Sequence, residues 1–211
     1  AQMTQWGCRQ SALSMPLAPP QPAWLSFDHG ADTVPESVLS LRWHSDRLGN
    51  IRTVWCYQTG IAPVDGEPLP LVILLDGRCW AHNMPVFDAL DDATRREHLP
   101  AAVYLLIDEI DSETRGRELP CNPAFWQAVI NELLPLVAQK VPLTDDPANT
   151  VVAGQSYGGL AALYAALHWP ARFGAALSQS GSFWWPDRSL VHKVTDPIHG
   201  RLPGAGGWLT D

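Results

Sequence analysis

The chain has 211 residues, 46% of them hydrophobic and 17% charged, and its 14 Lys and Arg against 22 Asp and Glu give a net charge of −8. This length suits one principal domain, and the apolar content predicts a packed core and excludes a disordered chain. No apolar run approaches the roughly 18 residues of a spanning helix, and no basic tract could neutralise phosphates. The sequence therefore predicts no membrane span and no binding of nucleic acid.

The two ends of the sequence differ from its middle. Residues 1–30 hold a proline cluster without periodicity, which predicts a linker, and residues 187–211 lack any strand and helix pattern, which predicts an atypical tail. We therefore expect the principal domain at residues 31–186. Because residue 1 is Ala and no signal-peptide pattern follows, we also expect the sequence to be a piece of a longer protein. The four cysteines lie far apart, which predicts reduced thiols without a zinc site or a disulfide framework: Cys8, Cys56, Cys79 and Cys121.

The first predicted element of the domain is a hairpin. Apolar residues alternate with polar ones over residues 38–43, and Leu48-Gly49-Asn50 interrupts the pattern. The alternation resumes over residues 51–57, where Thr53, Trp55 and Tyr57 share one face. Two alternating runs separated by a glycine turn predict an antiparallel pair of strands.

A different pattern follows, in which short continuous apolar runs alternate with helical stretches. The runs cover residues 71–75, 103–107, 151–153 and 173–177. Runs without polar alternation are typical of strands that helices cover on both faces. The resulting order βαβαβαβ, with right-handed crossovers, predicts an α/β fold with a mostly parallel central sheet.

Two helices of this region can be delimited from their residues. The first has a cap at Asn122, a proline at its first position and apolar residues at helical spacing, and Pro135 should kink its last turns. The second covers residues 160–167, which are nearly all small and apolar, and Pro170 ends it. We expect the second helix to be buried against the sheet.

The sequence Gly154-Gln155-Ser156-Tyr157-Gly158 stands between the third apolar run and the buried helix. A G-x-S-x-G motif at a strand-to-helix turn presents its serine as a nucleophile, with glycines where the two backbones pass closely. Ser156 is therefore the candidate nucleophile, and the backbone N–H of Tyr157 is a candidate oxyanion donor. The alternative is a glycine turn with an incidental serine.

Two further loops follow strands at the same predicted edge of the sheet. The loop after residues 71–75 offers the N–H groups of Gly77 and Arg78 as a second oxyanion donor, although a simple Asp-Gly turn explains it equally. The loop after residues 103–107 holds Arg115 and Arg117, whose guanidinium groups suit oxygen ligands in an otherwise acidic protein. Solvated loop charges remain the alternative for these arginines.

About residues 14–186 of the chain resemble a known family. The matching phrases are Ser14-Met15-Pro16-Leu17-Ala18-Pro19, Leu74-Leu75-Asp76-Gly77, Glu118-Leu119-Pro120-Cys121-Asn122, Val152-Ala153-Gly154-Gln155-Ser156, Ser178-Gln179-Ser180-Gly181-Ser182 and Trp184-Trp185-Pro186. They are similar to the catalytic part of the enterochelin (ferric enterobactin) esterases, in the esterase D branch of the α/β-hydrolase fold. The resemblance implies a cytoplasmic serine esterase that cuts the trilactone of a ferric catecholate siderophore without a cofactor or catalytic metal.

The resemblance also implies roles for individual residues. Ser156 is the nucleophile on this pattern, and Arg115 faces the substrate near the oxyanion site. A negatively charged siderophore with flat catechol rings gives reasons for Arg117, Trp184 and Trp185 as substrate contacts. A plain core role explains the two tryptophans equally well.

The chain departs from the family in the residues that should supply the general base of catalysis. A serine hydrolase of this fold has the order Ser, Asp or Glu, then His, but only His168, His192 and His199 follow Ser156, and we interpret His168 as structural. Because the closing strands, the acid and the histidine phrase of the family are not recognisable after Pro186, we expect very weak activity from this chain. The rival interpretations are another esterase D carboxylesterase or acyltransferase, a non-catalytic siderophore-binding remnant, and an unfolded gene fragment.

Overall fold

The computed structural model describes residues 15–20, 22–25, 34–61, 68–186 and 190, and two short strands near the start of the chain. These strands, β1 (Gln2–Met3) and β2 (Arg9–Gln10), pair with each other, and helix α1 (Pro22–Leu25) follows them. Most of residues 1–30 and of residues 187–211 lie outside the described residues. The linker at residues 1–30 and the tail at residues 187–211 therefore stay predictions.

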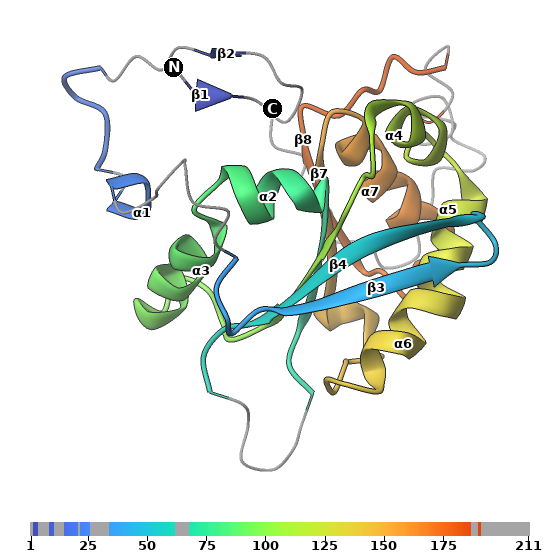
Figure 1. The fold of residues 1–211 in the computed structure, drawn as a ribbon, viewed down its shortest axis with the longest axis horizontal. Helices are drawn as coiled ribbons and strands as arrows, with labels where there is room; N and C mark the ends of the chain where they lie inside the picture. The colour runs from blue at the N-terminus through green and yellow to red at the C-terminus, as the bar shows by residue number, and fades with distance from the viewer. Residues whose placement is uncertain are drawn as a thin grey trace.

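A sheet of six strands forms the centre of the domain (Figure 1). Its spatial order is β3-β4-β6-β5-β7-β8, and its strands are β3 (Leu39–Ser45), β4 (Asn50–Gln58), β5 (Leu71–Leu75), β6 (Val103–Ile107), β7 (Thr150–Gln155) and β8 (Ala175–Gln179). Strands β3 and β4 form the predicted antiparallel hairpin, and β4 is also antiparallel to β6. Strands β6, β5, β7 and β8 are parallel to one another. The predicted α/β class with a mostly parallel sheet is confirmed.

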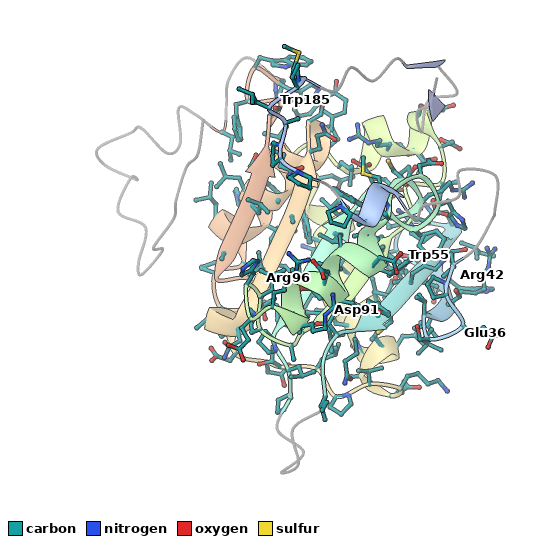
Figure 2. All side chains as sticks on the ribbon, turned by 90° about the vertical axis from the view of Figure 1, so that its left-hand side faces the viewer. Glu36, Arg42, Trp55, Asp91, Arg96 and Trp185 are labelled. Carbon is teal, nitrogen blue, oxygen red and sulfur yellow. The ribbon has the colours of Figure 1, made fainter. Side chains whose placement is uncertain are left out.

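Helices cover both faces of the sheet. Helices α2 (Gly77–Asn83) and α3 (Val86–Arg95) lie on one face, over Trp55 and Tyr57 of the hairpin (Figures 1 and 2). The Tyr57 hydroxyl donates a 2.6 Å hydrogen bond to Asp91 on α3. The opposite face holds α5 (Pro123–Ala128), α6 (Leu134–Ala138) and α7 (Tyr157–His168). Within the described part of the chain, every helix falls short of the length and apolar content that crossing a membrane requires.

The larger hydrophobic core lies under α5, α6 and α7. Trp126 is fully buried there, and its ring meets those of Phe125 and Phe173 edge to face, with centroids 5.2 Å apart in both pairs. Edge-to-face aromatic pairs of this kind each contribute about 0.5 to 1.5 kcal/mol beyond the area they bury. The core therefore fixes α5 against the segment that leads into β8.

The structure differs from the sequence prediction in two places. The helix that begins after Asn122 does not simply kink at Pro135: a π-helical turn (Val129–Leu133) precedes α6, so that the proline stands in the first turn of α6. Proline lacks an N–H group, and that position does not require one. The last strand begins at Ala175, two residues later than predicted, because the N–H groups of Phe173 and Gly174 donate to the carbonyls of Trp169 and Pro147 and not to a neighbouring strand.

Candidate active site

Ser156 occupies a tight bend between β7 and α7. Its backbone has φ 57° and ψ −117°, which is a strained conformation for a residue with a side chain. The Ser156 N–H donates to the carbonyl of Gln179, and the Ser156 carbonyl accepts from the N–H of Ser182, both at 3.0 Å. The bend is therefore held from both sides by the segment at the end of β8.

Close packing of backbones surrounds this bend. A Cβ atom added to Gly154 would lie 2.4 Å from the carbonyl carbon of Gly158, and one added to Gly159 would lie 2.6 Å from Oγ of Ser178. Only glycine fits at such distances. The predicted strand-to-helix turn of the G-x-S-x-G motif is confirmed by this geometry, and its glycines have the packing role expected of them.

The hydroxyl group of Ser156 stands at the carboxyl edge of the parallel strands. The side chain is half-buried, and its Oγ lies 3.0 Å from Oγ of Ser182, which is 5% exposed. Tyr157 is the first residue of α7, where a backbone N–H has no partner within the helix. An N–H group at that position can donate to an oxygen atom that approaches Ser156.

A second bend lies beside the first. Asp76, which follows β5, has φ 61° and ψ 44°, and Gly77 begins α2. A Cβ on Gly77 would lie 2.5 Å from the backbone of Leu106, and one on Gly158 would lie 3.3 Å from Oδ2 of Asp76. The backbone here is thus a strand-to-helix bend and not an isolated Asp-Gly turn. It brings the start of α2, with the N–H groups of Gly77 and Arg78, next to the start of α7.

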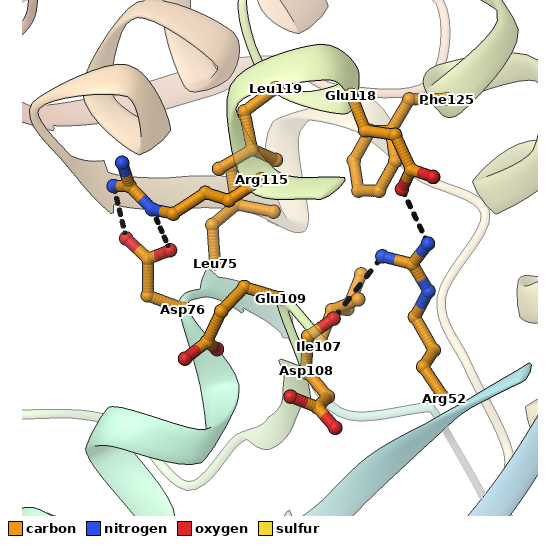
Figure 3. A pocket seen from close by; sticks show the side chains of 10 residues that line it. All are labelled: Arg52, Leu75, Asp76, Ile107, Asp108, Glu109, Arg115, Glu118, Leu119 and Phe125. Atoms are coloured by element: carbon orange, nitrogen blue, oxygen red, sulfur yellow. Dashed lines mark hydrogen bonds and ion pairs between the residues drawn. The ribbon is translucent and has the colours of Figure 1, made fainter. Parts of the chain in front are cut away.

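Arg115 connects the two bends (Figure 3). Its Nε and Nη2 donate to both carboxylate oxygens of Asp76 at 2.6 and 2.7 Å, and Nη2 also donates to the carbonyl of Gln155 at 3.1 Å. Its guanidinium carbon lies 5.7 Å from the centre of the Tyr157 ring. Since both charged side chains are at most 6% exposed, the pair forms a buried crosslink immediately before Ser156.

Helix α4 (Ser112–Glu118), which carries Arg115, is anchored at both ends. The carboxylate of Asp111 accepts from the N–H of Thr114 at 2.7 Å, and this bond lowers the pKa of Asp111. At the other end, buried Glu118 forms an ion pair with Arg52 of β4, which donates to the carbonyl of Asp108 at 3.2 Å (Figure 3). A helix of seven residues has little stability of its own. These contacts therefore set where Arg115 lies.

The remaining predicted site residues take different positions. The Arg78 side chain is 54% exposed and forms a bidentate salt bridge with Asp108, in which Nε donates to Oδ1 at 3.1 Å and Nη2 to Oδ2 at 2.8 Å. Arg117 lies on the exposed side of α4, with Nη1 3.9 Å from Oε1 of Glu113. Trp184 is 63% exposed, and its ring centre is 6.0 Å from that of Tyr157. Trp185, at the sheet end beyond β8 (Figure 2), is half-buried and packs against the larger core.

Another carboxylate, that of Glu109, lines the same pocket as the pair of Arg115 and Asp76. Oε2 of Glu109 is buried and has no hydrogen-bond partner among the described residues. Burial, followed by the carboxylates of Asp76 and Asp108, raises the pKa of Glu109. Within the ranges described above, no His, Cys, Asp and Glu side chains form a group that could hold a metal ion.

The structure also places His168. It ends α7, whose 12 residues span about 18 Å from the Ser156 end, and its Nδ1 lies 2.9 Å from the carbonyl of Tyr164. His168 therefore cannot reach Ser156. The other two downstream histidines, His192 and His199, lie outside the described residues.

Sequence reasoning did not single out two residues that the structure brings to this site, Asp76 and Ser182. Asp76 directly follows an apolar run that ends at the same sheet edge, and this position is a signal that could have found it. Ser182 lies in an irregular segment after β8, and no local pattern points to its contact with Ser156.

Comparison with known proteins gives close relatives of this chain. The Iron(III) enterobactin esterase of Dickeya dadantii is 54% identical over 188 residues, which is 88% of this chain and 43% of that protein. The crystal structure of the enterobactin esterase from Shigella flexneri in the presence of enterobactin matches with a TM-score of 0.75 and 54% identity, over 83% of this chain and 44% of that one. The same esterase in the presence of 2,3-di-hydroxy-N-benzoyl-serine matches with a TM-score of 0.76 and 51% identity, over 87% and 47% of the two chains.

These identities confirm the resemblance to the enterochelin esterases. The chain spans less than half the length of the curated relatives that it matches. The sequence model of the Esterase family, described as "Putative esterase", matches residues 47–203 and so covers more than half of the chain. The strained bend that presents Ser156 and the glycines around it fit that assignment, and the chain belongs to the Esterase family.

Proposed function

We propose that this protein is a serine esterase that hydrolyses the ester bonds of ferric enterobactin, with Ser156 as the nucleophile. The observation that carries the proposal is the half-buried hydroxyl group at the strained bend between β7 and α7. Relatives that are 54% identical are Iron(III) enterobactin esterases, which gives the substrate class. The iron arrives with the substrate, so the proposal needs no resident cofactor, and such an enzyme acts in the cytoplasm.

In this proposal the two neighbouring bends supply the oxyanion site. The hydroxyl oxygen of Ser156 attacks the ester carbonyl carbon, and the carbonyl oxygen takes up the negative charge. The N–H of Tyr157 and an N–H at Gly77 or Arg78 donate to that oxygen, because both bends leave N–H groups without helical partners. Removal of one such donor typically costs about 10² to 10³ in rate.

Substrate contacts follow from the charges and rings beside Ser156. Arg115 lies against Tyr157 and faces this edge of the sheet, where it can stabilise the anionic siderophore even though Asp76 offsets part of its charge. The exposed ring of Trp184, next to Tyr157, offers a flat surface for a catechol ring. Arg117 and Trp185 remain proposed contacts, but the exposed position of the first and the core packing of the second support them less.

The general base and its acid are proposed to lie outside the described residues. Among those residues, Ser182 is the hydrogen-bond partner of Ser156 Oγ, and His168 stands at the far end of α7. Loss of the base in a serine hydrolase lowers kcat by about 10⁶ and leaves about 10³ over water. We therefore expect this chain to turn over its substrate very slowly if neither His192 nor His199 serves as the base.

Labelling with a fluorophosphonate tests the nucleophile and the substrate class together. Mass spectrometry should place the label on Ser156, and Ser156→Ala should abolish it. Ferric enterobactin should protect the wild-type chain at concentrations at which a simple nitrophenyl ester does not. A label on another residue would exclude Ser156 as the nucleophile, whereas equal protection by both compounds would favour a general carboxylesterase.

A further inference from the structure

We propose that Ser182 is a second catalytic residue: its hydroxyl group donates a hydrogen bond to Oγ of Ser156 and stabilises that oxygen as its proton leaves. The inference deepens the proposed function and rests on Ser156 being the nucleophile. It names a partner for the nucleophile that the G-x-S-x-G motif does not contain, 26 positions further along the chain.

The contact between the two serines is close and fixed on both sides. The two hydroxyl oxygens are 3.0 Å apart, and the N–H of Ser182 donates to the carbonyl of Ser156, also at 3.0 Å. The carbonyl of Ser182 accepts from the N–H of Trp185 at 3.0 Å. With its backbone held in this way and only 5% of the residue exposed, Ser182 keeps its hydroxyl group at the nucleophile.

The requirements of the reaction decide the direction of the hydrogen bond. Each serine hydroxyl has one proton, and the geometry alone allows either oxygen to donate. A nucleophilic Ser156 must release its own proton to a base, so its oxygen can only accept from Ser182. Since the described residues offer the Ser182 hydroxyl no other hydrogen-bond partner, the bond to Ser156 also spares a buried polar group from being unsatisfied.

Reaction with a fluorophosphonate isolates the attack of the Ser156 oxygen from the later steps of ester hydrolysis. The Oγ–P bond forms, the P–F bond breaks, fluoride leaves, and the hydroxyl proton passes to water or to a base. Negative charge builds up on Oγ while the proton departs, and a donor at 3.0 Å stabilises that charge. A single neutral hydrogen bond of this kind corresponds to a change in rate of roughly two- to tenfold.

The chain offers a matched control on the same segment. Ser178 lies in β8, four residues before Ser182, and its Oγ is buried with no hydrogen-bond partner among the described residues. Ser178→Ala therefore removes an equal hydroxyl group without removing a contact to Ser156. It should leave the labelling of Ser156 unchanged.

The first experiment compares rates of fluorophosphonate labelling for the wild-type chain, Ser182→Ala and Ser178→Ala under conditions where all three are folded. We expect labelling to slow by roughly two- to tenfold in Ser182→Ala and to stay at the wild-type rate in Ser178→Ala. The proposal would be overturned if Ser182→Ala were labelled at the wild-type rate, or if the labelling rate of Ser178→Ala fell as much as that of Ser182→Ala.

A double-mutant cycle provides a measurement that does not require reactivity. The cycle uses urea unfolding of the wild-type chain, Ser156→Ala, Ser182→Ala and the double variant. Each substitution should lower the free energy of unfolding less in the background of the other than in the wild type, because the bond between the two hydroxyl groups is already lost. Additive effects would overturn the hydrogen bond. If Ser156 of the wild-type chain takes no label even in a prolonged reaction but the cycle is non-additive, the proposed function and the catalytic role of Ser182 both fail, while the contact between the serines stands.

Discussion

Two strand-to-helix bends lie side by side at the carboxyl edge of the sheet, one at Asp76 and one at Ser156. Both residues have a positive φ, 61° and 57°, but their ψ values are 44° and −117°. Asp76 thus adopts the left-handed helical conformation, which aspartate tolerates, whereas Ser156 is in a region that favours glycine. The second bend stores more backbone strain than the first.

The two bends also differ in what holds them. Asp76 is held by its side chain, through the buried bidentate salt bridge with Arg115. Ser156 is held by its backbone, through hydrogen bonds to Gln179 and Ser182. Backbone groups hold this bend, and among the described residues the Ser156 hydroxyl group is hydrogen-bonded to that of Ser182, so it is not tied up in an ion pair as the Asp76 carboxylate is. The comparison shows how one sheet edge can provide both a rigid support and a reactive group.

The largest expected effect tests whether charge holds the first bend. Asp76→Asn keeps the size and backbone preference of the residue but removes the negative charge that faces the buried guanidinium group of Arg115, and we expect a loss of about 3 to 5 kcal/mol in the free energy of unfolding. Asp92→Asn is the control, because Asp92 pairs with Arg95 and Arg96 on the surface of α3 and should cost at most about 1 kcal/mol. Urea unfolding that gives equal losses for both variants would contradict the role of the pair.

The next effect tests the close packing that both bends share. Gly77→Ala and Gly154→Ala each place a Cβ within 2.5 Å of backbone atoms, and we expect each to lower the stability by about 1 to 3 kcal/mol. Gly116→Ala is the matched control in α4, where a Cβ meets nothing within 4 Å and where helix propensity predicts a gain of up to about 1 kcal/mol. Differential scanning calorimetry should show a lower melting temperature for Gly77→Ala and Gly154→Ala and an unchanged or higher one for Gly116→Ala. A Gly154→Ala variant as stable as the wild type would show that the second bend is not closely packed.

The smallest effect concerns the charge beside the first bend. The pKa of Glu109 is raised in the folded chain by burial and by neighbouring carboxylates, so the folded state holds this proton more tightly than the unfolded state does. Its contribution to stability therefore falls as the pH rises from the ordinary carboxyl pKa through the raised one. We expect Glu109→Gln to raise the melting temperature at neutral pH and to match the wild type at pH values below the ordinary carboxyl pKa. A difference that does not depend on pH would exclude the ionisation of Glu109 as its cause.

Much of the fold could be predicted because its signals are local. The alternation in residues 38–57 predicted the hairpin β3–β4, and the continuous apolar runs predicted four strands, of which β8 begins two residues late. The cap at Asn122 was predicted from its neighbours and is present, with Oδ1 accepting from the N–H of Ala124 at 2.9 Å. The motif around Ser156 predicted the turn, because its glycines and the flanking strand and helix are contiguous.

The sequence by itself therefore determined the strands, the main helices and the bend at Ser156, since each depends on residues within a few positions of one another. Only the tertiary structure decided which groups meet at that bend. Arg115 binds Asp76 across 39 positions, Ser182 reaches Ser156 across 26, and Arg52 pairs with Glu118 across 66. These contacts arise because parallel strands distant in sequence end at one edge, and no local periodicity records which side chains that edge brings together.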